Sequence, residues 1–315
     1  MGTTKTFNDL TVGRSTIFEH LDAQEIGVHY QPIYSATDGA VYGYEALSRF
    51  EKGNGIDIAA LFKYAKREGL VSSLDVKCRE NAIMKASMLG LTRNGAFLFL
   101  NVCPETLMDP AHRVGITGEL AEEYGIPKEN IILEITEESV IENYDLFNQT
   151  ISHYRDQGYK IAIDDFGAGY CGLKMLSIIE PDFVKIDRHF VHGIDRSAIK
   201  LNLVTLIATV CRTLGIKVVV EGVETKEECG RVLVIGADLL QGYYLHKPAP
   251  DPSPAHALFP ADVSDISRAN CNGPHLSFPQ ATRIGNPSEQ QERFRTGRND
   301  KIEAEGLSTY QEVNR

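Results

Sequence analysis

The chain has 315 residues, of which 43% are hydrophobic and 24% charged, and its formal net charge is −11. This composition is normal for a globular protein with a sizeable core, and it excludes a chain that is disordered throughout. Residues 1–261 contain 35 acidic and 25 basic residues, so we expect no binding of a nucleic-acid polymer.

The expected cellular location follows from targeting signals and from the pattern of cysteines. The longest apolar runs are far shorter than the ~20 residues that a membrane span needs, and the first residues carry no secretory signal. Six widely scattered cysteines without C-x-x-C spacing indicate reduced thiols, not a disulfide framework or a zinc site. We therefore expect a cytoplasmic protein that makes no contact with a membrane.

Three regions follow one another along the chain. Residues 1–23 form an N-terminal lead with one expected helix over 15–21, and residues 24–260 form the body. Residues 261–315 form a tail, which we expect to be disordered because only 14 of the 54 residues from Asp262 onward are apolar. A charged helix over 293–305 that docks on a partner is the alternative for part of this tail.

In the body, short β-branched or aromatic runs alternate with longer helical patterns, which is typical of parallel strands joined by crossover helices. We expect strands over 25–33, 41–48, 97–102, 131–135, 160–164, 182–186, 216–220 and 239–244. Expected helices include 58–68, 74–89, 143–157, 197–214 and 225–235.

The first two expected strands are separated by only a short turn, so they should form an antiparallel hairpin. The pattern thus predicts an α/β fold, a modified (β/α)₈ TIM-type barrel with one reversed strand. An open doubly wound sheet is the alternative, but no glycine-rich dinucleotide loop follows the first strand.

Polar side chains end many of the expected strands. They are Glu45, Asn101, Glu134, Asp164, Asp165, Lys185, Asp187, Glu221 and Gln241. In a parallel barrel these strand ends converge on the face that carries catalytic groups. A single acidic residue after a strand is explained by helix capping, but the same feature at six strands is not.

Clustered carboxylates repel one another unless cations bind among them, and oxygen ligands without His or Cys select Mg²⁺ or Mn²⁺. The adjacent Asp164 and Asp165 could bridge two ions for displacement at phosphorus, with Lys185 orienting water or stabilising phosphoryl charge. Metal-assisted phosphoester hydrolysis is the chemistry this pattern favours. A metal-dependent aldolase or an enolising barrel fits it almost as well.

Several ordered motifs in this region are similar to those of one family. They are Tyr30-Gln31-Pro32-Ile33, Glu45-Ala46-Leu47, Asn101-Val102, Leu133-Glu134-Ile135-Thr136-Glu137, Asp164-Asp165-Phe166-Gly167, Val184-Lys185-Ile186-Asp187, Glu221-Gly222-Val223-Glu224 and Gln241-Gly242-Tyr243-Tyr244. Over about 24–250 the chain resembles the EAL family of cyclic di-GMP phosphodiesterases. The resemblance implies a barrel with an antiparallel first strand and hydrolysis of cyclic di-GMP to linear pGpG.

The resemblance also implies a role for each matching residue. The implied ligands of one metal are Glu45, Asn101, Glu134 and Asp164. The implied partners of a second metal, or of a bridging water, are Asp165, Asp187 and Glu221. Lys185 resembles the residue that orients this water, and Glu221 resembles a catalytic base.

Four further residues match groups around the family's site. Gln241 and Glu224 resemble residues that orient ligands or position the substrate. Arg49 resembles a contact to the substrate phosphate, and Glu137 resembles an anchor for the loop after Asp165. A homodimer is a further expectation from the resemblance.

For three of these residues a simpler role is open. Glu137 could stabilise the first turn of the following helix, Arg49 could pair with Glu51 at the surface, and Gln241 could be a structural donor.

The sequence also departs from the family at Cys171-Gly172, where Ser-Ser is usual. The loss of two hydroxyls that could cap the following helix, together with an extra glycine, should loosen the loop after Asp165. A catalytically silent module that binds cyclic di-GMP or a protein is the second functional hypothesis.

Overall fold

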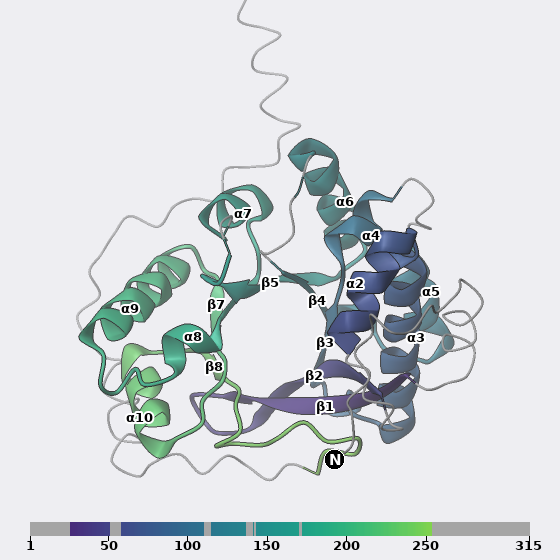
Figure 1. Ribbon diagram of the computed structural model, residues 1–315. Coiled ribbons are helices and arrows are strands. Elements are labelled where there is room, and N and C mark those ends of the chain that lie inside the picture. Colours follow the sequence, from purple (N-terminus) through teal and green to yellow (C-terminus); the bar gives the residue numbers. More distant parts are fainter. Residues whose placement is uncertain are drawn as a thin grey trace, which may run out of the picture. The chain divides into compact units, whose positions relative to one another are not determined.

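The computed structural model describes residues 26–50, 58–109, 115–136, 141, 143–169 and 172–253. Within them, eight strands close into a barrel in the order β1 to β8, and helices lie around its outside (Figure 1). The predicted (β/α)₈-type barrel with an antiparallel first strand is confirmed. The N-terminal lead with its expected helix, and the tail, lie outside the described residues.

The reversed strand comes from the hairpin at the start of the body. Strands β1 (Ile26–Ser35) and β2 (Val41–Phe50) are antiparallel, and the short connection between them is too short for a crossover. β1 is also antiparallel to β8 (Leu239–Leu240), whereas the other neighbouring pairs are parallel. The hairpin register places Gln31 opposite Glu45.

The remaining strands are short and mostly apolar. They are β3 (Phe97–Asn101), β4 (Ile131–Thr136), β5 (Lys160–Phe166), β6 (Phe183–Ile186) and β7 (Lys217–Val220). Strands of a parallel barrel are buried on both faces, which explains these nearly continuous apolar runs. The charged residues inside the runs, Glu134 and Lys185, are therefore exceptions that need a partner.

The helices pack around the barrel. They are α2 (Ile58–Glu68), α3 (Val71–Leu89), α4 (Pro104–Met108), α5 (Ile116–Glu123), α6 (Tyr144–Asp156), α7 (Gly172–Ile179), α8 (Arg188–Val191), α9 (Ala198–Thr213) and α10 (Lys226–Ile235). Polar caps begin several of them, such as Ser197 for α9 and the Thr225–Glu228 capping box for α10. In the part of the chain that is described, none of these helices has the length and apolar character to cross a membrane.

The structure differs from the sequence-based expectation at a few elements. The last strand ends at Leu240, not at 244, because residues 242–246 turn: the amides of Leu245 and His246 both donate to the carbonyl of Gly242. Helix α3 begins at Val71 instead of 74. The short helices α4, α5, α7 and α8 were not among those expected from the sequence.

One layer of apolar side chains fills the barrel interior. Seven strands contribute to it, through Ile33, Phe99, Ile132, Ala162, Phe183, Val219 and Leu239, each at most 2% exposed. A larger apolar cluster lies between the strands and the helices. The interior layer closes the barrel beneath the ends of the parallel strands and forms the floor of the site described next.

Candidate active site

A ring of polar side chains lies one layer above this apolar floor. Successive side chains of a strand point to opposite faces, so the residue two positions further along points to the same side. In seven strands the floor residue is thus followed by a polar residue, and in β2 Glu45 follows Gly43, which has no side chain to add to the floor. The eight polar residues are Gln31, Glu45, Asn101, Glu134, Asp164, Lys185, Glu221 and Gln241. For the reversed strand β1 the step runs backward, from Ile33 to Gln31.

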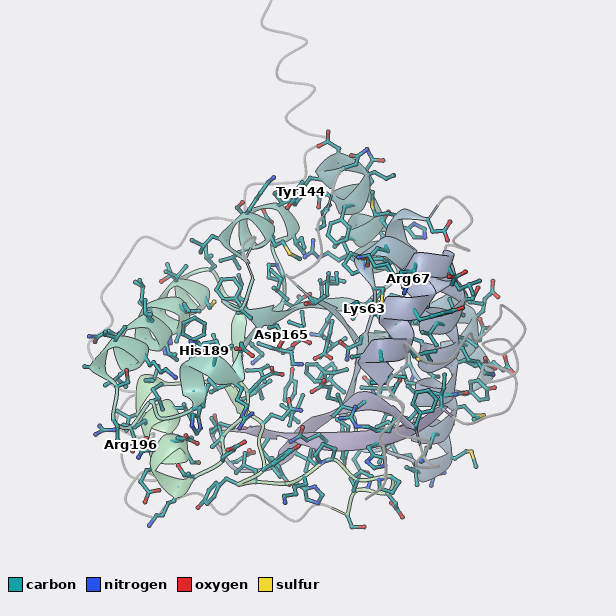
Figure 2. The ribbon with its side chains drawn as sticks, in the orientation of Figure 1. Lys63, Arg67, Tyr144, Asp165, His189 and Arg196 are labelled. Carbon is teal, nitrogen blue, oxygen red and sulfur yellow. The ribbon has the colours of Figure 1, made fainter. Side chains whose placement is uncertain are left out.

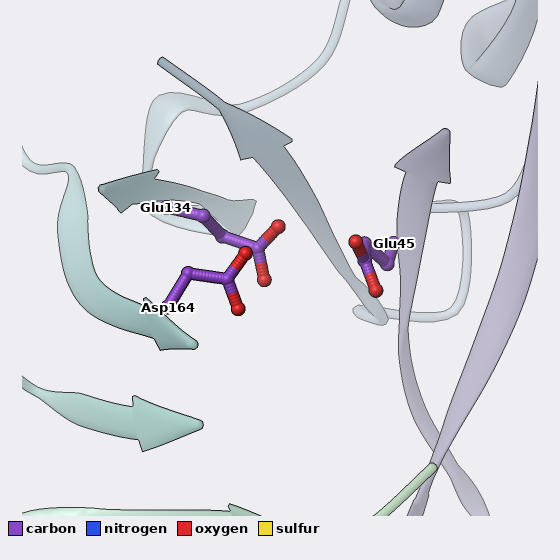
Figure 3. A group of neighbouring side chains, drawn as sticks. All are labelled: Glu45, Glu134 and Asp164. Atoms are coloured by element: carbon purple, nitrogen blue, oxygen red, sulfur yellow. The ribbon is translucent and has the colours of Figure 1, made fainter. Parts of the chain in front are cut away.

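Three carboxylates from three strands meet inside this ring. Glu45, Glu134 and Asp164 each offer an oxygen within 4.8 Å of the others, and all three residues are buried. Figure 3 shows the three side chains pointing toward one another from β2, β4 and β5. Like charges held this close in a buried site need a compensating cation.

The ammonium of Lys185 lies among these carboxylates. Its Nζ is 2.6 Å from Glu134 Oε1, 2.8 Å from Asp164 Oδ1, 2.7 Å from Glu221 Oε1 and 3.5 Å from Glu45 Oε2. The side chain is only 1% exposed. Burial lowers the pKa of Lys185, but the four carboxylates outweigh burial and hold it well above its ordinary value. Lys185 is therefore a fixed positive charge at neutral pH.

A second carboxylate group is built by an irregularity in β5. Ile163 pairs with Val184 and Phe166 with Ile186, so Asp164 and Asp165 together oppose the single residue Lys185. Asp165 has a positive φ of +52°, a backbone conformation that residues other than glycine rarely adopt. Such a bulge re-aims a side chain that would otherwise point away from the barrel.

The bulge brings both aspartates to one place. Asp164, Asp165 and Glu221 each offer an oxygen within 4.8 Å of the others. Figure 2 labels Asp165 near the opening of the barrel. Asp164 thus belongs to both carboxylate groups.

Gln241 closes the ring between the last and the first strands. Its Nε2 donates to Glu45 Oε2 at 2.6 Å and to Gln31 Oε1 at 3.1 Å, and Gln31 in turn donates to the carbonyl of His246 at 3.0 Å. The buried Oε1 of Gln241 has no hydrogen-bond partner among the described residues. It is a further oxygen available to a cation beside Glu45.

The residue after Gln241 has to be glycine. A Cβ on Gly242 would lie 2.1 Å from the carbonyl oxygen of Val223, so no side chain fits there. This close approach fixes the turn that follows Gln241 against the turn that follows Glu221. The amide of Tyr244 donates to the same carbonyl at 3.0 Å.

Two predicted metal ligands make other contacts. The Nδ2 of Asn101 donates to Glu134 Oε2 at 3.3 Å, which places its side chain next to the first carboxylate group. Asp187 instead caps α8, where its Oδ1 accepts from the amide of His189 at 2.9 Å. Asp187 belongs to neither carboxylate group, and its role as a metal partner stays a prediction.

The predicted substrate contacts differ in their surroundings. Glu224 Oε1 pairs with Arg188 Nη2 at 2.7 Å in a partly exposed ion pair. Arg49, near the end of β2, donates to the carbonyl of Ser48 at 2.8 Å. Glu137 and Cys171 lie outside the described residues.

Sequence reasoning missed two residues of this site. Gln31 was part of a recognised motif but received no role, although the hairpin register places it opposite Glu45. Arg188 follows Asp187 directly, and no sequence pattern linked it with Glu224, which lies after a different strand. The alternation of side chains along the strands could have found the first but not the second.

Burial and repulsion raise the pKa of two carboxyls. For Glu134 burial is the largest cause; Lys185 opposes it, and Glu45 and Asp164 add to it. For Glu221 burial is again the largest cause, opposed by Lys185. The four carboxylates exceed the one ammonium in charge, so the arrangement is suited to take up further positive charge.

The sequence model of the EAL domain family matches residues 14–248 of this chain. The chain belongs to the EAL domain family.

One relative of similar sequence is the cyclic di-GMP phosphodiesterase PdeA of Borreliella burgdorferi. It is 28% identical over 226 residues, which cover 71% of this chain and 33% of PdeA. The chain spans between 28% and 48% of the length of the first three curated relatives that it matches.

Solved structures of EAL proteins share the fold. BlrP1 of Klebsiella pneumoniae, with manganese and cyclic di-GMP, has a TM-score of 0.66 and 32% identity, covering 73% of this chain and 57% of BlrP1. A standalone EAL protein of Vibrio cholerae O395, bound to cyclic di-GMP, has a TM-score of 0.63 and 30% identity, covering 71% of this chain and 92% of that protein.

Proposed function

We propose that this EAL domain hydrolyses cyclic di-GMP to linear pGpG in the cytoplasm, with two Mg²⁺ or Mn²⁺ ions as cofactors. The observation that carries the proposal is the pair of carboxylate groups that share Asp164 at the mouth of the barrel. Relatives named as cyclic di-GMP phosphodiesterases, and EAL structures in complex with this nucleotide, support the choice of substrate.

The donor set fits a pair of hard cations. Glu45, Glu134 and Asp164, with Asn101 beside them, would hold one ion, and Asp164, Asp165 and Glu221 would hold the other. These donors are oxygens, and the partnerless Oε1 of Gln241 adds another beside Glu45. When bound, the ions would polarise the phosphodiester and activate water for attack on phosphorus.

The protein groups complete this chemistry. Lys185 keeps its proton, so it acts as a positive charge that orients water or stabilises a phosphoryl oxygen, and not as a base. Glu221, whose Oε1 lies 2.7 Å from Lys185 Nζ, would accept the proton of the attacking water. Arg49 and Glu224 would position the substrate, and Glu137 would anchor the loop after Asp165.

The test combines one binding titration and one product chromatogram per ion. With Mg²⁺ or Mn²⁺, cyclic di-GMP should yield pGpG. With Ca²⁺ it should bind with little cleavage, because Ca²⁺ ligands lie at about 2.4 Å with variable number, against about 2.1 Å in octahedral Mg²⁺ shells. Full turnover in Ca²⁺ would contradict the geometric argument.

The same experiment distinguishes the second hypothesis, the catalytically silent module. Binding of cyclic di-GMP without product in any ion would favour that module. The filled set of ring positions favours the enzyme, since a silent module has no need of every acidic residue in the two groups.

We propose further that the functional unit is a homodimer formed through α9. The outward face of this helix, with its C-cap residue Leu214, carries apolar side chains that are between 41% and 75% exposed, namely Ile199, Leu203, Leu206, Val210 and Leu214. Their spacing of three and four residues makes one continuous stripe. In Figure 1, α9 lies at the periphery of the barrel.

The face is also uncharged. No acidic residue lies within α9, and its two cations fold back onto the chain: Lys200 donates to carbonyls of the α8 region and Arg212 to those of Ile235 and Gly236. The hydroxyls of the helix donate to carbonyls of its own preceding turn. Although two copies with a net charge of −11 each repel, a contact through this uncharged apolar stripe brings no like charges together, so the stripe suits a second copy as its occupant.

Leu206→Glu should convert the dimer to a monomer, because a twofold contact buries the new charge twice. We expect the dissociation constant to rise at least about 30-fold, as for the loss of a central interface residue. Sedimentation velocity measures this change. Met88→Glu, at an exposed apolar residue of α3, is the control and should leave the dimer intact. A monomeric wild-type protein would contradict the proposal.

A further inference from the structure

A buried ion pair lies in α3, outside the site described above. Asp75 Oδ2 and Arg79 Nη2 are 2.9 Å apart, and the two side chains are 3% and 2% exposed. Arg79 also donates to the hydroxyl of Thr117 in α5 and contacts the phenol of Tyr154 in α6. The pair therefore joins three helices on one side of the barrel.

The second oxygen of Asp75 reaches the chain that leaves β3. The amide of Cys103 donates to Asp75 Oδ1 at 3.2 Å, and Cys103 comes two residues after Asn101. Between them, the amide of Val102 donates to the carbonyl of Glu134 at 2.9 Å. The two amides that follow Asn101 are thus held in succession, the first by the sheet and the second by Asp75.

Stability alone does not explain a charged pair at this position. Taking two charges out of water is costly, and replacing a buried ion pair by apolar residues is often neutral or stabilising. A carboxylate does offer two oxygens in fixed directions, and Arg79 orients it. The feature that requires Asp75 in particular is the amide of Cys103, which no apolar side chain can satisfy.

We propose that Asp75, oriented by Arg79, is a positioning residue that fixes the turn after β3. It thereby holds the side-chain amide of Asn101 against the carboxylate of Glu134. Asn101 lies at the last position of β3, and the amide of Cys103, two residues later, is held by Asp75 and not by the sheet. The proposal rests on the proposed metal site, in which Asn101 is a ligand. Residues that orient a ligand are worth about 10-fold to 100-fold in metal affinity.

The test compares two double variants that both lack the ion pair. Asp75→Asn/Arg79→Met keeps an oxygen that accepts from Cys103, whereas Asp75→Leu/Arg79→Met, of similar side-chain size, does not. We expect the Leu variant to bind Mn²⁺ at least about tenfold more weakly than the Asn variant, with no substrate present. The amide of Cys103 should also exchange with solvent faster in the Leu variant alone.

Control variants separate positioning from folding. Thr117→Val removes another partner of Arg79 without touching the turn after β3, so it should lower the melting temperature but leave Mn²⁺ affinity unchanged. Asp75→Asn alone leaves Arg79 without its charge partner and should behave in the same way. Loss of Mn²⁺ affinity in these two variants, in step with stability, would overturn the proposal.

Two outcomes distinguish this proposal from the proposed function. Equal Mn²⁺ affinity and equal Cys103 exchange in the two double variants would overturn the positioning role. A wild-type protein that binds no Mn²⁺ would overturn the metal site instead, and faster exchange of Cys103 in the Leu variant would still support the contact to Asp75.

Discussion

Replacing Lys185 by Met is expected to abolish turnover and to destabilise the metal-free protein. The ammonium is 2.6 to 2.8 Å from three carboxylates, two of them buried and one partly buried, and its removal leaves them without a counter-charge. Breaking a buried ion pair from one side costs about 3–5 kcal/mol, which lowers the melting temperature by roughly 10 °C in a domain of this size.

Added metal should reverse this loss of stability. The ammonium shares its carboxylates with the proposed ions, so Lys185→Met should bind Mn²⁺ more tightly than the wild-type protein and gain more stability from it. Thermal unfolding with and without Mn²⁺ measures both effects. Lys160→Met, which removes a lysine near Phe97 at the start of β5, is the matched control. Unchanged melting of metal-free Lys185→Met would show that the ammonium does not neutralise the group.

Much of this site could be predicted from the sequence, because the period of a strand determines which side chains share a face. Glu134 follows a run of three apolar residues, and Lys185 interrupts another run. Charged residues at such positions have to point into a common interior, and the structure brings them together. The short turn between the first two strands was likewise sufficient to predict the reversed strand.

Other features depend on contacts that a strand pattern does not contain. The bulge at Asp164 and Asp165 breaks the alternation, so both side chains reach the same group although a regular strand would separate them. The early end of β8 follows from the approach of Gly242 to Val223, which lies in another loop. Asp75 and Arg79 received no role because helical spacing pairs them with each other and says nothing of Cys103.

Replacing Glu45 by Gln should separate activity from stability. Glu45 belongs to a group of four carboxylates around one ammonium, so losing one negative charge relieves repulsion in the metal-free protein. In the wild-type protein Gln241 Nε2 donates to Glu45 Oε2 at 2.6 Å, and the side-chain oxygen of the substituted Gln can still accept this hydrogen bond. We therefore expect the melting temperature of the metal-free protein to stay the same or to rise.

Turnover should change in the opposite direction. Glu45→Gln weakens the proposed first ion site, and losing about 4 kcal/mol of transition-state stabilisation lowers the rate about 10³-fold. Glu80→Gln removes the same charge from a partly exposed pair with Lys77 on α3, outside the ring, and should keep full activity. The measurements are the rate of pGpG formation, Mn²⁺ affinity by calorimetry and thermal unfolding. Because the variant is expected to be no less stable than the wild-type protein, lost activity would not be an effect of misfolding. Wild-type turnover and Mn²⁺ affinity in Glu45→Gln would mean that the ions, if they bind, are held by other residues.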